Sequence, residues 1–348
     1  MKISVCIATH ERPALLQSAL TTLKDQTQLA DEIVVSDSSV SPHSRTVVEQ
    51  FAASHPELGV KHVHSAKRAL PWQRWWAAQH ATGDVILFLD DDVSLVPTAL
   101  ELLAQTYEEL ILRGGERLAG VGFMMTWTDG EQPIRDPHSL KERWVGTAHW
   151  TSGQITTGGL GVSAAGLRAD HPLPVEQLWG GAMSFWRSVL QRVGLLDQLV
   201  SLYEEGIGRA EDAVLSFCAR QHGALYIISK PVALHPREAK DTGVPIPYAR
   251  NGWRMGLTGT WGRAHTMRWL SRNQWACLRQ WLLVASLEFG RCLFEIAKRP
   301  HRWANWERLA GAIYGMTRAL LCWHTIPPAP RSSPVTKSTL SKHAPDVL

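Results

Sequence analysis

The chain has 348 residues, a length that suits one large domain or a domain of about 250 residues with an appendage. With 45% hydrophobic and 20% charged residues, its composition excludes a disordered or fibrous protein. The net charge of +4 is unevenly divided: residues 250–348 carry 15 Lys and Arg against 4 Asp and Glu, so this part is at +11 and residues 1–249 are at −7. This asymmetry indicates an acidic body and a basic C-terminal part with an anionic partner.

The sequence lacks the patterns of a membrane-spanning helix and of a secretory signal. Its longest run without a charge, residues 144–167, is rich in Gly, Ser and Thr, and the apolar residues 3–8 meet charged side chains too early for a signal peptide. The five cysteines lie far apart and form no C-x-x-C pair, which predicts buried free thiols rather than disulfides or a thiolate zinc site. We therefore expect a cytoplasmic location.

Short apolar runs alternate with helical patterns over residues 1–130, which is typical of βαβ units on a mainly parallel sheet. The predicted strands are 3–8, 33–36, 60–64 and 85–89, and the predicted helices begin at Pro13 and cover 72–81. In such sheets ligands bind at the carboxyl ends of the strands. Three polar clusters, residues 9–11, 37–39 and 90–92, fall at that edge.

The second half of the chain is less regular at first. Residues 130–180 are rich in Gly, Pro, Ser and Thr and predict a long excursion over the active face. Regular structure returns with predicted strands at 182–186 and 224–228 and helices at 188–193 and from Glu211, and residues 263–319 have a helical pattern. We expect an α/β catalytic domain over 1–245, with halves 1–130 and 130–245, a basic helical region over 246–325, and a disordered tail over 326–348.

Three consecutive aspartates, Asp90, Asp91 and Asp92, follow the most apolar predicted strand. Like charges this close together are costly unless a cation is present, and a cluster of carboxylates favours Mg²⁺ or Mn²⁺. The alternative is a solvated turn in which one Asp caps the next helix, but that role needs only one acid. A diphosphate is the natural partner of such a metal.

Five segments, taken in order, resemble glycosyltransferase family 2, of the GT-A fold, over about residues 1–240. They are Ile-Ser-Val-Cys-Ile-Ala-Thr-His-Glu-Arg-Pro at 3–13, Glu-Ile-Val-Val-Ser-Asp-Ser-Ser at 32–39, Ala-Thr-Gly-Asp-Val-Ile-Leu-Phe-Leu-Asp-Asp-Asp at 81–92, Gly-Gly-Ala-Met-Ser-Phe-Trp-Arg at 180–187 and Glu-Asp at 211–212. The resemblance implies a nucleotide-diphospho-sugar donor and an inverting transfer to an acceptor hydroxyl.

The resemblance also implies roles for individual residues. Asp37 matches the acid that bonds the nucleotide base, and the first strand meets that base through Thr9, His10 and Glu11. Asp90 and Asp92 match the outer acids of the D-x-D element that contains Asp91, and Asp92 matches the metal ligand. Asp212 matches the general base, and Glu211 lies beside it.

The sequence departs from the family pattern at three places. Residues 36–39 read Ser-Asp-Ser-Ser where Asp-Asp-Gly-Ser is usual, and Gln73-Arg74-Trp75 keeps only the arginine of Ala-Arg-Asn. Gly180-Gly181-Ala182-Met183 replaces Gly-Gly-Asn-Met, so the polar side chain near the acceptor or donor sugar is absent. None of these changes affects the metal ligands or the base.

Further candidates rest on single residues. His235 follows a predicted strand and is a candidate metal ligand, although a lone histidine is more often an ordinary core or surface residue. Arg68 and Arg74 are candidate phosphate contacts, with a solvated basic face as the alternative. Trp179 is the best candidate for stacking on a sugar ring, with core packing as its alternative.

The basic helical region admits two interpretations. Tryptophans recur along it opposite Lys and Arg, as in interfacial helices that lie on anionic lipid. Alternatively, the apolar face packs on the catalytic domain or on a second subunit. No nucleic-acid-binding module is present, so we expect no nucleic-acid partner.

The sequence therefore predicts an inverting, metal-dependent sugar transferase that acts on a saccharide or lipid-linked saccharide in cell-surface polysaccharide or glycolipid synthesis, in the cytoplasm or on the cytoplasmic face of the membrane. One rival is a catalytically lapsed sugar-nucleotide-binding or membrane-binding protein, which the altered second motif makes conceivable. A nucleotidyltransferase is the other rival, but residues 10–13 offer no glycine-rich phosphate loop.

Overall fold

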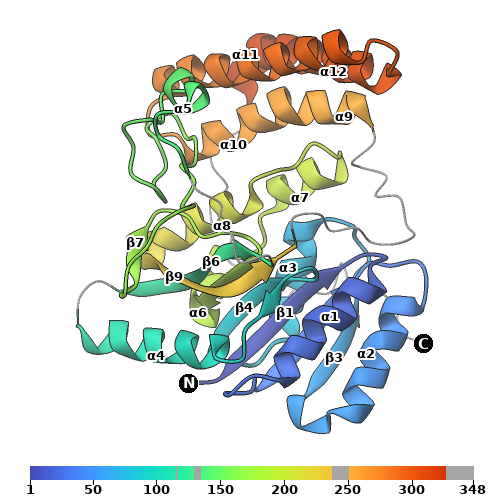
Figure 1. Cartoon of the computed structure of the whole chain (residues 1–348), viewed down its shortest axis with the longest axis vertical. Helices are drawn as coiled ribbons and strands as arrows, with labels where there is room; N and C mark the ends of the chain where they lie inside the picture. The colour runs from blue at the N-terminus through green and yellow to red at the C-terminus, as the bar shows by residue number, and fades with distance from the viewer. Residues whose placement is uncertain (115–116, 129–134, 237–250, 327–348) are drawn as a thin grey trace.

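The computed structural model describes residues 1–114, 117–128, 135–236 and 251–326. Within them, nine strands form one sheet that helices flank, and the C-terminal helices form a separate layer at the top of the view (Figure 1). The predicted α/β class is confirmed. The predicted disordered tail lies, apart from Ile326, outside the described residues.

The first half of the sheet is parallel, as predicted, and its strands run in the order β3-β2-β1-β4. The strands are β1 (Ile3–Thr9), β2 (Glu32–Asp37), β3 (Val60–His64) and β4 (Val85–Asp90). The helices among them are α1 (Pro13–Lys24), α2 (His43–Ser54) and α3 (Leu70–His80). The predicted apolar face of the first helix, Leu16, Leu20 and Leu23, is fully buried. Burial of both faces explains the apolar runs of β1, β2 and β4, whereas β3, at the edge of the sheet, is more exposed and contains Lys and His.

The second half makes the sheet mixed. Strand β8 (Ala182–Trp186) lies antiparallel between β4 and β6 (Leu118–Trp127), and β9 (Ala224–His235) runs parallel to β6. Two short strands, β5 (Ser94–Leu95) and β7 (Leu173–Val175), pair antiparallel with β9. Strand β9 continues beyond the predicted 224–228 because pairing with β6 resumes after a register shift, past the Ser-Lys-Pro sequence that interrupts its apolar pattern.

Five further helices complete the α/β part. They are α4 (Ala99–Leu112), α5 (Leu140–Trp144), α6 (Arg187–Val193), α7 (Asp197–Glu204) and α8 (Glu211–Ala219). The excursion predicted between residues 130 and 180 has, in its described portion, only α5 and β7 as regular elements. Four of the five cysteines are buried and Cys322 is partly buried, and all are free thiols, as predicted.

The C-terminal region folds into α9 (Gly252–Leu257), α10 (Arg263–Leu270), α11 (Gln274–Lys298) and α12 (Trp303–Cys322). Trp261, Trp269 and Trp281 are buried in the same apolar core as helix α8. A side chain at Gly262 would meet the carbonyl oxygen of Ile207 at 2.1 Å, so the two parts approach at backbone distance. The inner face of these helices therefore packs on the α/β part, as one of the two interpretations predicted. None of the described helices combines the length and hydropathy needed to cross a bilayer.

His265 on α10 makes the fold sensitive to acid. Its ring lies 4.4 Å from that of Trp261, and neither ring nitrogen has a hydrogen-bond partner among the described residues. Burial, followed by the positive charge of Arg318, lowers the pKa of His265 to about 4. The folded state therefore binds fewer protons than the unfolded state, in which the pKa is about 6.5.

We expect the free energy of unfolding to fall as the pH drops from about 6.5 to about 4, by up to about 3 kcal/mol from His265 alone. Urea unfolding at several pH values measures this loss. The variant His265→Leu should lose less stability over the same window, whereas His171→Leu, at an exposed position, should behave as the wild type. Equal acid sensitivity of all three proteins would contradict the assignment.

Candidate active site

The carboxyl ends of β1, β2 and β4 bring the predicted polar clusters together. Thr9 pairs in register with Asp37 on one side, and Ala8 pairs with Asp90 on the other. The loops that follow these three strands consequently lie at one edge of the sheet. This arrangement is the one predicted from the sequence.

Within the aspartate cluster, Asp91 points into the protein. It is 4% exposed, and its carboxylate accepts hydrogen bonds from Thr9 Oγ1 at 2.7 Å and from Arg12 Nη1 at 3.1 Å. The same Arg12 nitrogen lies 3.1 Å from Asp92 Oδ2. Burial raises the pKa of Asp91 to about 7, against the opposing effect of Arg12. Arg12, which the sequence analysis did not single out, thus relieves the repulsion between the two acids.

Arg74 joins the aspartate cluster to the start of helix α8. From helix α3, its Nη2 donates to Asp90 Oδ1 and to the carbonyl oxygen of Gly180, both at 2.7 Å, and its Nη1 donates to Glu211 Oε1 at 3.0 Å. The side chain is buried. These contacts favour a positioning role for Arg74 over the phosphate contact that we predicted.

Asp212 and Glu211 begin helix α8, directly after Ala210, whose φ of 52° is in the left-handed region. Such a backbone is uncommon for a residue with a side chain and often accompanies a functional site. Asp212 accepts from the backbone N–H of Gly180 at 3.1 Å and of Ala213 at 2.8 Å. Burial first, and then the charge of Glu211, raise the pKa of Asp212 to about 6.

Glu211 is held more tightly than its neighbour. Its carboxylate accepts from Arg74, and the hydroxyl of Tyr203 donates to its second oxygen. Within the described part of the chain, the hydrogen-bond partners of Asp212 are backbone N–H groups only. Of the two acids, Asp212 is therefore better placed to accept a proton from a ligand.

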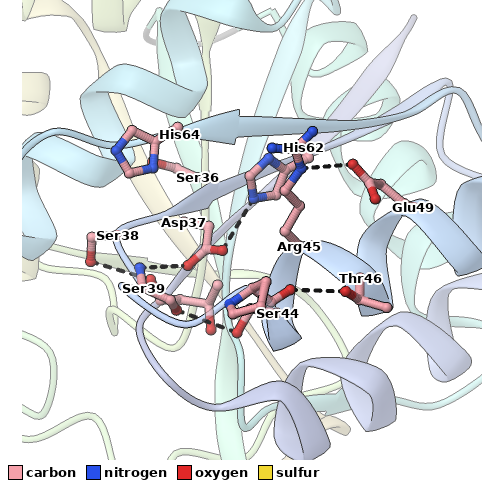
Figure 2. Close-up of polar contacts among 12 residues, drawn as sticks. Ser36, Asp37, Ser38, Ser39, Ser44, Arg45, Thr46, Glu49, His62 and His64 are labelled. Atoms are coloured by element: carbon pink, nitrogen blue, oxygen red, sulfur yellow. Dashed lines mark hydrogen bonds and ion pairs between the residues drawn. The ribbon is translucent and has the colours of Figure 1, made fainter.

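Asp37 is buried at the end of β2, and Figure 2 shows it between two donors. Its Oδ1 accepts from the backbone N–H of Ser39 at 2.8 Å, and its Oδ2 lies 3.1 Å from His62 Nε2. Burial alone would raise the pKa of Asp37, but the hydrogen bonds from His62 and Ser39 prevail and lower it. Asp37 is therefore an anion. His62 pairs with Val35 across the strands, a neighbour relation that the sequence alone does not reveal.

The loop after β1 is fastened to the loop after β2. Glu11, with a φ of 54°, accepts from the backbone N–H groups of residues 40 and 41 at 2.6 and 2.9 Å. His10 Nδ1 lies 3.0 Å from the carbonyl oxygen of Ser38. Burial, followed by the charge of Arg68, lowers the pKa of His10. His10 and Glu11 thus shape the loops around the expected base site, and the exposed Arg68 lies near them.

His235, at the end of β9, lies beside the aspartate cluster. Its Nε2 is 3.5 Å from Asp92 Oδ1, and its Nδ1 is 2.7 Å from the carbonyl oxygen of Pro236. Because a carbonyl only accepts, Nδ1 carries a proton, and Nε2 is the ring nitrogen that faces Asp92. Among the described residues, no group of three His, Cys, Asp or Glu side chains that could hold a metal ion is present.

Trp179 and the two glycines that follow it lie near both Arg74 and Asp212, because the Gly180 carbonyl accepts from Arg74 and the Gly180 N–H donates to Asp212. Trp179 is partly buried and packs against the apolar core, which favours its alternative interpretation as a core residue. A side chain at Gly180 would meet Glu211 Oε1 at 3.1 Å and Arg74 Nη2 at 3.2 Å. A side chain at Gly181 would meet the Met125 methyl group at 3.1 Å. The glycines therefore allow the close approach of β4, β8 and α8.

The structure thus brings three aspartates at a parallel sheet edge close to the acidic start of a helix, and these are acids that the resemblance to family 2 glycosyltransferases singled out. Residues 4–111 match the family model described as "Glycosyl transferase family 2". Residues 4–111 are therefore similar to this family, in agreement with the resemblance seen in the sequence motifs.

Two curated relatives extend this finding. The "O-antigen biosynthesis protein RfbC" of Myxococcus xanthus is 30% identical over 171 residues, which are 43% of this chain and 13% of the relative. The "GalNAc(5)-diNAcBac-PP-undecaprenol beta-1,3-glucosyltransferase" of Campylobacter jejuni is 29% identical over 108 residues, which are 31% of this chain and 35% of the relative. The chain thus spans 13% and 35% of the lengths of these relatives.

Two solved structures align with most of the chain, at lower sequence identity than the curated relatives. The "Mannosyltransferase PcManGT from Pyrobaculum calidifontis in complex with GDP-Man and Mn2+" aligns with 93% of this chain and 83% of its own, at 17% identity and a TM-score of 0.48. The structure of "GalNAc-T7 with UDP, GalNAc and Mn2+" aligns with 76% of this chain and 50% of its own, at 17% identity and a TM-score of 0.49.

Proposed function

We propose that the protein transfers a sugar, with inversion, from a nucleotide-diphospho-sugar to an acceptor hydroxyl. The observation that carries this proposal is the continuous contact from Asp90 through Arg74 to Glu211, with Asp212 beside it. This contact fixes the position of the aspartate cluster, where we expect the diphosphate, relative to Asp212, which we expect to be the base. A single displacement needs such a relation, because the base and the leaving group act on opposite faces of the sugar.

In the proposed reaction, Asp212 accepts the proton of the acceptor hydroxyl as its oxygen bonds to the anomeric carbon. The bond from that carbon to the diphosphate oxygen breaks, and the nucleoside diphosphate leaves with the electron pair. Burial raises the pKa of Asp212 to about 6, so the carboxylate is ionised at neutral pH yet more basic than an exposed one. Asp37 and the loop at residues 38–41 hold the nucleoside.

A divalent ion, Mn²⁺ or Mg²⁺, fits the residues beside the diphosphate position. Asp92 and the lone pair of His235 Nε2 offer two ligands, and such ions often keep waters and take substrate phosphates as their other ligands. The ion would neutralise the charge that develops on the leaving diphosphate. Arg12 bonds Asp92 Oδ2, whereas Asp92 Oδ1 faces His235, so Oδ1 is the oxygen that would hold the ion.

A nucleoside diphosphate with Mn²⁺ should raise the temperature of unfolding, because both bind the folded state. We expect Asp92→Asn to remove the increment due to Mn²⁺ while leaving the melting temperature of the ligand-free protein nearly unchanged. Asp170→Asn, at an exposed aspartate, is the matched control and should respond to Mn²⁺ as the wild type does. The metal assignment fails if Asp92→Asn keeps the full Mn²⁺-dependent increment. Binding without turnover of any sugar nucleotide would favour the lapsed binding protein.

The acceptor that we propose is a saccharide or lipid-linked saccharide in the synthesis of a cell-surface polysaccharide or glycolipid. The names of the two curated relatives, which refer to O-antigen biosynthesis and to an undecaprenol-linked acceptor, support this setting. We propose a cytoplasmic location with peripheral contact to the membrane, where an acceptor of this kind would be met.

A further inference from the structure

Helix α12 presents its large apolar side chains to the outside and its small residues to the protein. Trp303 and Leu321 are 74% and 71% exposed, and other large residues share this outward stripe at helical spacing: Trp306, Ile313, Tyr314 and Leu320. The buried side consists of Gly311, Ala312, Gly315 and Ala319. A surface helix of a globular protein normally shows the reverse, with its large apolar residues facing the core.

The small residues explain how α12 is attached. A side chain at Gly311 would meet the carbonyl oxygen of Trp253 at 2.1 Å, and one at Gly315 would meet Thr260 Oγ1 at 2.2 Å. Helix α12 therefore packs at backbone distance on α9 and the segment after it. This attachment needs none of the large outward side chains.

Helix α11 extends the same surface. It lies beside α12 in the outermost layer of the molecule, far from the first strands of the sheet (Figure 1). Its own outward residues include Trp275, Leu282, Leu293 and Phe294. We call the exposed apolar residues named on α11 and α12 the apolar platform. Clustered exposure of this kind marks an interaction surface, unlike apolar residues scattered singly.

The exposed charges around the apolar platform all have one sign. Between residues 274 and 326, every one of which the structure describes, six Lys and Arg are exposed: Arg279, Arg291, Lys298, Arg299, Arg302 and Arg318. None of the three Glu in this range is exposed, and Glu288 is paired with Arg308 at 2.6 Å. The platform is therefore both apolar and cationic.

We infer that the apolar platform lies on an anionic lipid bilayer, with α11 and α12 parallel to the membrane plane. Tryptophan and tyrosine favour the headgroup region, the aliphatic side chains enter the acyl boundary, and the Lys and Arg contact anionic headgroups. A second copy of the chain fits less well, because two cationic platforms facing each other would repel. This inference deepens the proposed peripheral location and does not depend on sugar transfer.

The test is co-sedimentation of the full chain with vesicles of phosphatidylglycerol and phosphatidylcholine in equal parts, compared with phosphatidylcholine alone. We expect binding to the anionic vesicles that weakens as salt increases. The double variant Trp303→Ser with Leu321→Ser should bind at least about tenfold more weakly, because it removes apolar area that enters the bilayer. Leu112→Ser, at an 85% exposed leucine on α4, should bind as the wild type.

Two results would overturn the inference: a wild type that does not bind anionic vesicles, or a double variant that binds them as the wild type does. Size-exclusion chromatography with light scattering tests the alternative, in which a second copy of the chain binds the apolar platform. A wild-type dimer that becomes a monomer in the double variant would identify the platform as a contact between copies. An Asp212→Asn protein should still bind the vesicles, so a failure of the proposed reaction is distinguishable from a failure here.

Discussion

Replacing Asp212 by Asn is expected to slow sugar transfer by roughly 10²–10⁴-fold, the range typical of the loss of a general base. The backbone N–H groups of Gly180 and Ala213 donate to different oxygens of the Asp212 carboxylate. The amide keeps the size of the side chain and one acceptor oxygen, so it keeps one of these two hydrogen bonds while it removes the basic carboxylate. Donor binding, measured by calorimetry or by thermal shift, should therefore stay within a few-fold of the wild type.

The pH dependence of the transfer rate is a second test of the role of Asp212. Because the pKa of Asp212 is raised to about 6, the wild-type rate should fall as the pH drops below about 6 and the carboxylate takes up a proton. The folded state binds this proton more readily than the unfolded state, so the charge destabilises the fold above that pH. As the pH rises from 3.8 to about 6, Asp212→Asn should therefore lose less stability than the wild type, as measured by urea unfolding.

Glu211→Gln is the matched control, because Glu211 already accepts from Arg74 and Tyr203. We expect Glu211→Gln to slow transfer less than Asp212→Asn does. Its rate should still fall as the pH drops below about 6, as the wild-type rate does. Near-normal turnover by Asp212→Asn together with normal donor binding would reject Asp212 as the base. The reversed order of the two variants would assign the role to Glu211.

Local sequence signals predicted most of the first half of the fold. Apolar runs located β1, β2 and β4, and the 3–4 spacing of Leu16, Leu20 and Leu23 identified the buried face of α1. Those signals are local, because a strand or helix is set by residues close in sequence. They gave no information on β5 and β7, which are two and three residues long and exist only through pairing with β9.

The charged partners of the site were the part that the sequence did not reveal. Arg12 and Asp91 are 79 residues apart, and Arg74 and Glu211 are 137 apart. Such contacts follow from the strand order, which composition and periodicity do not specify. The motifs identified the acids, whereas the fold shows that Arg12 lies beside Asp91 and Asp92 and that Arg74 lies between Asp90 and Glu211.

The sequence pattern alone did not show which tryptophans of the C-terminal region are buried and which are exposed. Trp281 is fully buried in the core, whereas Trp275 on the same helix is 80% exposed. A helix with apolar residues on two faces gives the same periodic signal on each face. The packing is observed on the inner face of these helices, and the membrane contact that we infer concerns their outer face.

Arg74→Met is expected to destabilise the fold by about 3–5 kcal/mol, the usual cost of removing one partner of a buried ion pair. The side chain of Arg74 is 5% exposed and lies between Asp90 and Glu211. Burial raises the pKa of Asp90, while the charge of Arg74 opposes that rise. Without the guanidinium, both acids would remain beside Asp212 with no cation between them.

Urea unfolding at neutral pH measures the effect of Arg74→Met, and Arg45→Met is the matched control. Arg45 forms an exposed pair with Glu49 within one helix, at 2.7 Å, and the loss of such a pair should change stability little. Because the uncompensated carboxylates can take up protons, the deficit of Arg74→Met should shrink as the pH falls towards 5. Arg74→Lys should recover only part of the loss, since one ammonium group lacks the fork that bonds Asp90, Glu211 and the Gly180 carbonyl together. A variant Arg74→Met as stable as Arg45→Met at every pH would show that the acids are neutralised by other means, and that Arg74 does not hold the aspartate cluster to the start of helix α8.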